Sequence, residues 1–351
     1  MVRKGIVLAL ASAALFGMST PFAKLLLGET PPLLLAGLLY AGSGLGLALI
    51  FVGRRVVAPR TPIALPRRGE WRWLAVAIVF GGVLAPVAMM TGLATSTAST
   101  ASLLLNLEGA FTALLAWFVF GENVDWRIAG GMAAIIAGGL ALVWNPGWSA
   151  GISVGSLLVV LACICWAIDN NFTRRISMTD ATFIAAAKGL TAGGVNLALA
   201  LLTGQQLPAA PVFVSAMLLG LVSYGVSLGL FVLALRELGA ARASAYFSVA
   251  PFFGAALAVI MQIDHVTGRL VGAGLLMAAG VWLHVSERHA HAHSHEAMRH
   301  THTHVHDEHH HHSHDETSAG SQPHTHEHEH APMTHAHPHY PDVHHRHPHP
   351  R

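Results

Sequence analysis

The sequence predicts an all-α integral membrane protein: ten transmembrane helices arranged as two inverted five-helix repeats, followed by a disordered C-terminal tail. Three observations lead to this fold class. Long apolar runs follow one another up to residue 286, and basic residues gather in every second turn between them. Only 11% of the chain is charged, whereas an ordinary globular protein is about 25% charged. Because the apolar runs are continuous and do not alternate, helices are favoured over a membrane barrel.

Ten apolar runs are long enough to be membrane spans, since a bilayer core needs about 20 apolar residues per helix. The expected spans are residues 5–27, 32–52, 72–92, 97–120, 127–144, 152–172, 181–203, 212–235, 242–262 and 268–286. Several turns between them are very short, such as Gly28–Pro31 and Asn145–Gly151. Short turns make consecutive helices antiparallel neighbours.

The basic residues predict the orientation, because cytoplasmic loops carry an excess of Lys and Arg. With Arg3 and Lys4 inside, the opposite side holds only Arg269 and Lys24, and the Lys24 side chain can extend outward from its span. The arginines on the inner side are Arg54, Arg55, Arg60, Arg67, Arg68, Arg72, Arg127, Arg174, Arg175, Arg236 and Arg242. We therefore expect both termini in the cytoplasm and a multi-pass protein of a bacterial inner membrane. A cleavable signal peptide is the alternative for the first run, but its removal would spoil the repeat described next.

A shift of 142 residues superimposes the fourth and fifth spans on the ninth and tenth. Glu122 then falls on Asp264 and Arg127 on Arg269. This repeat predicts a first unit at 1–145, a second at 151–286, and the tail at 287–351. Because each unit has an odd number of helices, the second must cross the membrane upside down. Such inverted repeats are typical of secondary transporters, whose substrate site lies near the bilayer midplane between the halves.

Each copy has an acidic turn, an arginine and a glycine-rich helix, as in Gly121-Glu122-Asn-Val-Asp-Trp-Arg127 and Asp264-His-Val-Thr-Gly-Arg269. With ten spans in two copies, residues 5–286 resemble the EamA branch of the drug/metabolite transporter superfamily. The resemblance implies secondary active transport of a small metabolite by alternating access. It does not define the substrate, since the branch is similar to exporters and importers of many metabolites. Asp264 stands where the pattern usually has Glu.

The same turns have a structural interpretation. An acidic residue near a helix N-terminus complements the helix dipole and can cap the turn. The glycines that follow let helices approach closely, either within one chain or in a homodimer.

Ionisable residues inside spans are costly and by default mark a functional site. Glu108 lies in the middle of the fourth span, Asp169 in the sixth, with Asn170 next to it, and Lys188 in the seventh. The charged form of a mid-membrane carboxylate is destabilised unless a cation lies close. Glu108 is therefore the candidate for binding a coupling proton or a cationic substrate group. The alternatives are a structural ion pair of Glu108 with Lys188, and one of Asp169 with Lys188.

Three further residues belong to the predicted substrate and coupling site. Asn106 precedes Glu108 by two positions, about 200° around a helix, so the two side chains do not share a face. Tyr40 occupies the position that Lys188 has in the other copy, and Trp166 the position of Phe16. These aromatic side chains line the cavity in one interpretation and pack in the core in the other.

Several functional classes are excluded or disfavoured. The chain has no phosphate-binding loop of the type that drives transport with ATP. It has no nucleophile–base arrangement, so it is not expected to be an enzyme, and no cofactor is required. Nucleic acid is not an expected partner, because the basic residues flank apolar runs. Cys163 and Cys165 lie inside an apolar run, which implies no disulfide framework. The expected partners are the lipid bilayer and a small-molecule or ion substrate.

The tail contains 24 of the 26 histidines and almost no apolar residues, so it is expected to be disordered. Imidazole is a favoured ligand for zinc, nickel, cobalt and copper, and a flexible His-rich chain can chelate these metals without a preformed site. The predicted metal ligands are His291, His293, His295, His300, His302, His304, His306, His309, His310, His311, His312, His314, His324, His326, His328 and His330. A pH-sensing tail and a neutral solvated tail remain alternatives.

The tail gives two alternative functions for the whole chain. One is a divalent metal transporter for zinc, nickel or cobalt, whose intramembrane oxygen ligands would be Glu108, Asp169, Asn106 and Asn170. The other is a membrane-anchored metal buffer or sensor that transports nothing. The first is weakened because His265 and His284 lie at span ends, so that no histidine accompanies the oxygen ligands.

Overall fold

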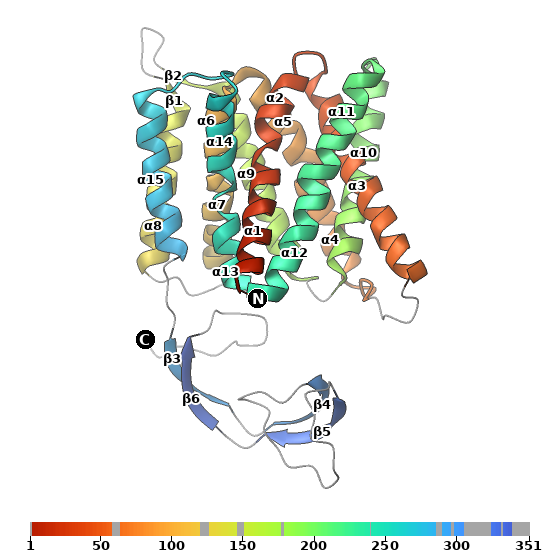
Figure 1. Ribbon diagram of the computed structural model, residues 1–351, viewed down its shortest axis with the longest axis vertical. Coiled ribbons are helices and arrows are strands. Elements are labelled where there is room, and N and C mark those ends of the chain that lie inside the picture. Colours follow the sequence, from red (N-terminus) through yellow and green to blue (C-terminus); the bar gives the residue numbers. More distant parts are fainter. Residues whose placement is uncertain are drawn as a thin grey trace. The chain divides into compact units, whose positions relative to one another are not determined.

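The computed structural model describes residues 2–57, 64–119, 126–145, 151–176, 179–238, 240–285, 290–295, 298–304, 324–330 and 333–338. They belong to two units, Met1–Glu287 and Arg288–Arg351. The first unit is a bundle of helices, and the second contains short strands (Figure 1). The predicted Gly121–Asp125 turn and the histidines at 306, 309–312 and 314 lie outside the described residues.

The bundle begins with α1 (Val2–Gly17), α2 (Ser19–Leu26), α3 (Pro32–Val57), α4 (Trp71–Ala77), the π-helix η1 (Ile78–Leu84), α5 (Ala85–Thr95), α6 (Ala98–Leu104), α7 (Asn106–Phe118) and α8 (Trp126–Val143). Two short antiparallel strands follow, β1 (Trp144–Asn145) and β2 (Gly151–Ile152). The rest is α9 (Val154–Arg174), α10 (Ala181–Leu202), α11 (Ala210–Gly220), the π-helix η2 (Leu221–Val226), α12 (Ser227–Leu238), α13 (Ala240–Phe247), α14 (Ala250–Ile260) and α15 (Gly268–Val285).

Eight helical stretches of the described chain are long and apolar enough to cross a membrane, which indicates a multi-pass membrane protein. The last two predicted spans contain shorter apolar helices, Ala250–Ile260 and Gly268–Leu283. In the ninth predicted span the helix is interrupted between α13 and α14, so neither piece reaches spanning length alone. The count of ten crossings stays a prediction.

The sequence explains where many helices begin. The Ser153 hydroxyl accepts from the backbone N–H of Ser156 at the start of α9, and the Asp180 carboxylate accepts from those of Thr182 and Phe183 at the start of α10. Prolines lie in the first turns of α11 and α14, where a missing N–H costs no helical hydrogen bond.

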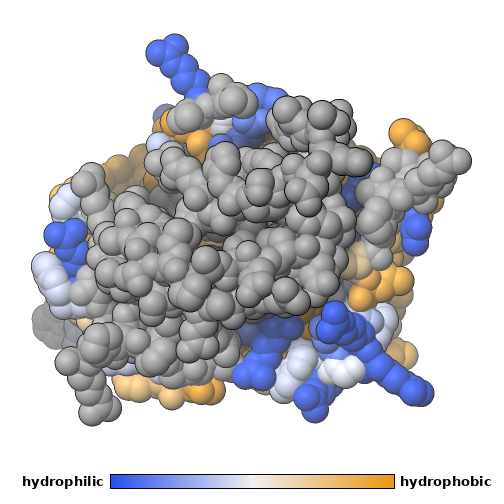
Figure 2. Space-filling model, turned by 90° about the horizontal axis from the view of Figure 1, so that it is seen from below, coloured by the Kyte–Doolittle hydropathy of each residue, from blue (hydrophilic) through white to orange (hydrophobic). Residues whose placement is uncertain are grey.

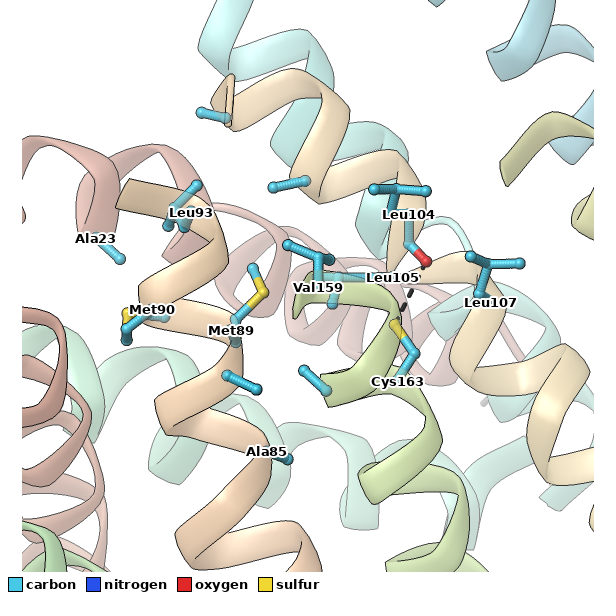
Figure 3. Close-up of a cluster of buried hydrophobic side chains, with 14 of the residues drawn as sticks. Ala23, Ala85, Met89, Met90, Leu93, Leu104, Leu105, Leu107, Val159 and Cys163 are labelled. Carbon is cyan, nitrogen blue, oxygen red and sulfur yellow. Dashed lines mark hydrogen bonds between the residues drawn. The ribbon is translucent and has the colours of Figure 1, made fainter. Parts of the chain in front are cut away.

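Helix interruptions recur at equivalent places in the two halves. The π-helices η1 and η2 begin at residues 78 and 221, and α6 and α13 end at residues 104 and 247, so both pairs are separated by 143 residues. The break after α6 leaves the Leu104 carbonyl to accept a hydrogen bond from the Cys163 thiol, at 3.4 Å (Figure 3). Cys163 and Cys165 are free and buried, so the expectation of no disulfide is met for both.

Helices from different halves pack against each other in pairs. Contacts join α3 with α10, α8 with α15, α1 with α12, α5 with α9, and α6 with α14. The α3–α10 contact is made partly by backbone: a Cβ built on Gly189 would lie 2.6 Å from the Cα of Gly44. Between α8 and α15, a Cβ on Gly280 would lie 2.6 Å from the Gly131 carbonyl oxygen. The glycine faces therefore serve close helix packing within the chain.

The described residues of the tail form two antiparallel pairs of strands, where the composition predicts no regular structure. Strand β3 (Ala290–His295) pairs with β6 (Met333–Pro338), and β4 (Met298–His304) pairs with β5 (His324–His330). The difference follows from the His-x-His repeat, whose period of two residues is that of a strand. In β4–β5 the cross-strand partners are His300 and His328, His302 and His326, and His304 and His324.

Candidate functional site

An ion pair between Asp169 on α9 and Lys188 on α10 forms the charged centre of the site. Lys188 Nζ lies 2.6 Å from Asp169 Oδ1 and 2.5 Å from Oδ2. The side chains are 18% and 6% exposed, so the carboxylate is enclosed and the ammonium is partly accessible. The Thr173 hydroxyl donates to Asp169 Oδ1 at 2.8 Å. Of the two alternatives for Lys188, the structure has the pair with Asp169.

The carboxylate of Asp169 packs directly on the π-helix η1. A Cβ built on Gly81 would lie 1.9 Å from Asp169 Oδ2, so only glycine fits there. The Gly81 carbonyl accepts from the Tyr40 hydroxyl at 2.9 Å and from Trp166 Nε1 at 3.1 Å. Pro86, five residues later, has no N–H to offer this carbonyl, so the two aromatic side chains act as its donors. Both were predicted site residues, and one carbonyl brings them together.

Glu108 lies on α7, which also packs against α9. Its Oε1 accepts from the Asn170 side-chain amide at 2.8 Å, and the same amide lies 3.3 Å from the Thr112 hydroxyl. Glu108 is half-buried and Asn170 is exposed. The alternative ion pair of Glu108 with Lys188 is not among the ion pairs of the described residues: Lys188 pairs with Asp169, and an amide from α9 donates to Glu108.

Asn106 does not join the other predicted residues. It is buried, and its side-chain amide donates to the Leu103 carbonyl at 2.9 Å, where α6 ends, and approaches Met277 Sδ of α15 at 3.8 Å. Asn106 therefore closes the helix break and faces away from Glu108, as their spacing predicts.

The four candidate oxygen ligands for a metal substrate take part in different contacts: Asn106 donates to the Leu103 carbonyl, and Asn170 donates to Glu108. In the part of the chain that the structure describes, no group of three or more His, Cys, Asp and Glu side chains is placed to hold a metal ion.

A cavity of about 290 Å³ lies beside the ion pair. Its wall comes from α3, α9, α10, η2 and α12, and thus from both halves of the chain. The lining residues are Tyr40, Ser43, Thr173, Ala181, Ile184, Ala185, Lys188, Gly189, Tyr224 and Leu228. Ala181 and Thr173 belong to the first turn of α10 and the last turn of α9, so the cavity lies toward that end of the bundle.

The same end of the bundle is rich in exposed arginines. Arg54 pairs with Asp180 at 3.2 Å and also donates to Thr182 at 3.0 Å, beside the first turn of α10. Arg67, Arg68, Arg174 and Arg175 are also exposed. Viewed from below, hydrophilic side chains appear at the margins of this face, between hydrophobic side chains (Figure 2). The arginines mark this as the end predicted to face the cytoplasm.

The opposite end of the bundle is held together around the turn between α5 and α6. Lys24 Nζ donates to the carbonyls of Leu93, Ala94 and Ser96, at 2.7, 3.1 and 2.8 Å. The ammonium of Lys24 thus binds the carbonyls at the end of α5.

Asp264 binds the same turn from the second half. It is buried, and its carboxylate accepts from the backbone N–H of Ser99 at 2.6 Å, at the start of α6. Asp264 was expected to cap the turn at the start of its own following helix. Instead Arg269 donates to the Trp144 carbonyl, and Thr267 caps α15.

Sequence reasoning missed several residues around the site. Thr112 and Thr173 lie four positions after Glu108 and Asp169, and this spacing on a helix could have indicated them. Tyr224 and Ser43 line the cavity, but they carry no charge and no sequence signal distinguishes them from core residues. Gly81 depends on a contact between distant helices and had no signal of its own.

The model of the EamA-like transporter family matches the chain twice, at residues 3–144 and 153–286. The chain belongs to the EamA-like transporter family. It is 28% identical to a protein of Methanothermobacter thermautotrophicus named an uncharacterized transporter, over 80% of this chain and 85% of that one. It is 26% identical to a protein of Salmonella typhimurium named a probable amino-acid metabolite efflux pump, over 81% of this chain and 96% of that one.

A further relative, from Escherichia coli and of the same name, is 31% identical over 50% of this chain and 55% of its own length. A solved crystal structure is similar in fold, with a TM-score of 0.57 and 18% identity, covering 80% of this chain and 95% of that one. As a member of the EamA-like family, the chain is a membrane transporter.

Proposed function

We propose that this EamA-like protein is a secondary active transporter that moves a small organic metabolite across the inner membrane by alternating access. In this proposal the ten predicted spans form two inverted five-helix repeats, and both termini are cytoplasmic. The double match to one family model, the matching π-helices and the helix pairs between halves support the repeat. The arginine-rich end supports the orientation.

The cavity beside Lys188 is the observation on which the proposal depends. It lies toward the arginine-rich end and is lined by both halves, while Lys24 and Asp264 bind one turn at the other end. A substrate site between two repeats, with one end held closed, is the arrangement that alternating access requires. The structure would then represent a state open to the cytoplasm.

Side-specific labelling of cysteine variants tests this mechanism. In a background with Cys163→Ala and Cys165→Ala, an impermeant maleimide should label the Ala185→Cys variant much faster from the cytoplasmic side than from outside. Ala185 lines the cavity, and Leu202, 83% exposed at the far end of the same helix, provides the Leu202→Cys control for outside access. Transported substrate should change the Ala185→Cys labelling rate. Equal labelling from both sides, unaffected by any metabolite, would contradict alternating access.

The second candidate function is metal buffering by the tail, with zinc, nickel, cobalt or copper bound by its histidines. The β4–β5 register favours it, because three cross-strand histidine pairs occur at every second position and therefore on one face of the ribbon. Imidazole is a favoured ligand for these metals, so closely spaced histidines suit metal binding.

Cellular metal content separates the two candidates. We expect cells making the full chain to hold more zinc, nickel or cobalt than cells making a version truncated after Ser286, because truncation removes 24 histidines. Glu108→Gln should leave this difference unchanged, since Glu108 lies in the helical unit. If Glu108→Gln lowers the metal content and truncation after Ser286 does not change it, the metal is instead the transported substrate.

A further inference from the structure

Lys188 sets the charge that a molecule meets in the cavity. Among the described residues that line the cavity, Lys188 is the only charged one, and the others are two tyrosines, small hydroxyl side chains and apolar residues. Asp169 stands behind the ammonium, is 6% exposed and does not line the cavity. A molecule in the cavity therefore meets a cation first and no carboxylate.

The ammonium has hydrogen-bonding capacity left for a ligand. Lysine carries three N–H donors, and the two oxygens of Asp169 accept two of them. The third can serve an oxygen that enters from the cavity, without breaking the resident ion pair. A carboxylate is well suited, because charge-assisted hydrogen bonds are about twice as strong as neutral ones.

The aromatic side of the cavity indicates the rest of the ligand. The rings of Tyr40 and Tyr224 lie 5.9 Å apart, and Phe16 contacts Tyr224 edge-on at 5.7 Å. The Tyr40 hydroxyl is occupied by the Gly81 carbonyl, so this residue presents mainly its ring. Such a wall favours a flat apolar group, and a volume of about 290 Å³ admits a molecule of that size.

From these contacts we infer that the cavity binds a small organic acid, whose carboxylate accepts from Lys188 and whose apolar or aromatic part packs on Tyr40 and Tyr224. This inference rests on the proposed transport function and narrows its substrate class. An ammonium group on the ligand would find no acidic partner among the lining residues described. An organic acid should therefore bind more tightly than the amino acid of the same skeleton.

The test is direct binding to the purified full-length protein in nanodiscs, measured by calorimetry. We expect 3-phenylpropanoate to bind, and its amide and phenylalanine each to bind about tenfold more weakly. Equal affinity of the amide, or tighter binding of phenylalanine, would overturn the inference. Because binding is measured without transport, a bound acid that is never transported would contradict the proposed function alone. Transport of another metabolite without acid binding would contradict this inference alone.

Variants of the ion pair separate binding from structure. Lys188→Gln should reduce acid binding at least about tenfold, and Lys188→Arg should largely restore it. Asp169→Asn should increase acid affinity, because it removes a negative charge behind the ammonium while keeping an acceptor for Thr173. A purely structural ion pair predicts the opposite, a loss of binding in both single variants. The double variant Asp169→Asn with Lys188→Gln keeps the region neutral and controls for folding; acid binding to it at wild-type affinity would also overturn the inference.

Discussion

Glu108→Gln is expected to lower gradient-driven transport by about tenfold to a hundredfold, the range that corresponds to losing one charge-assisted interaction. Glutamine has nearly the same shape and can still accept from Asn170, so the α7–α9 contact should persist. What is lost is a group that can carry a charge or a proton within a predicted span. The measurement is substrate flux in proteoliposomes, with and without an imposed proton gradient.

Two comparisons give this experiment its meaning. Glu29→Gln changes an exposed carboxylate in the turn before α3 and should leave flux unchanged. If Glu108→Gln abolishes accumulation but preserves exchange of substrate across the membrane, Glu108 serves coupling. If exchange is lost as well, Glu108 serves substrate binding. Unchanged flux in both assays would exclude Glu108 from the transport cycle.

Gly189→Ala is expected to destabilise the protein by about 1–3 kcal/mol, the usual cost of overpacking a close contact. The added methyl group would lie 2.6 Å from the Cα of Gly44, and backbone cannot rotate away as a side chain can. The measurement is the free energy of unfolding in detergent, together with the yield of monodisperse protein.

The same helix supplies the matched control. A Cβ on Gly194 would meet nothing within 4 Å, so Gly194→Ala should be neutral or stabilise the helix by up to about 1 kcal/mol. If the two alanine variants behave alike, the α3–α10 contact does not limit stability.

The sequence alone was sufficient for the membrane class, the positions of the long helices and the family, because these follow from apolar runs and from a repeat. It also placed Asp169 and Lys188 on helices joined by a short loop, which made their ion pair foreseeable. The partner of Glu108 was not foreseeable in this way, because it depends on how α9 is rotated against α7. That rotation is set by contacts such as Gly81 with Asp169, which join distant parts of the chain.

The helix interruptions likewise depend on contacts between distant residues, which the sequence alone does not predict. Pro86 is visible in the sequence, but the π-helix before it also requires Tyr40 and Trp166 to bind the Gly81 carbonyl. The turn held by Lys24 and Asp264 looks like an ordinary polar loop until the two halves are packed together. Local patterns therefore predict the elements, and tertiary contacts decide which side chains meet.

Two glycines of α3 make close helix contacts on either side of a residue that lines the cavity. Ser43 lines the cavity and stands between Gly42 and Gly44, whose backbones touch α11 and α10. Its backbone is therefore fixed on both sides by contacts that tolerate no larger residue, while the residue itself lines the cavity. Evolution or engineering can change this one side chain and reshape the cavity wall without moving the helix that carries it. Relatives with different substrates would then keep the glycines and differ at the residue between them.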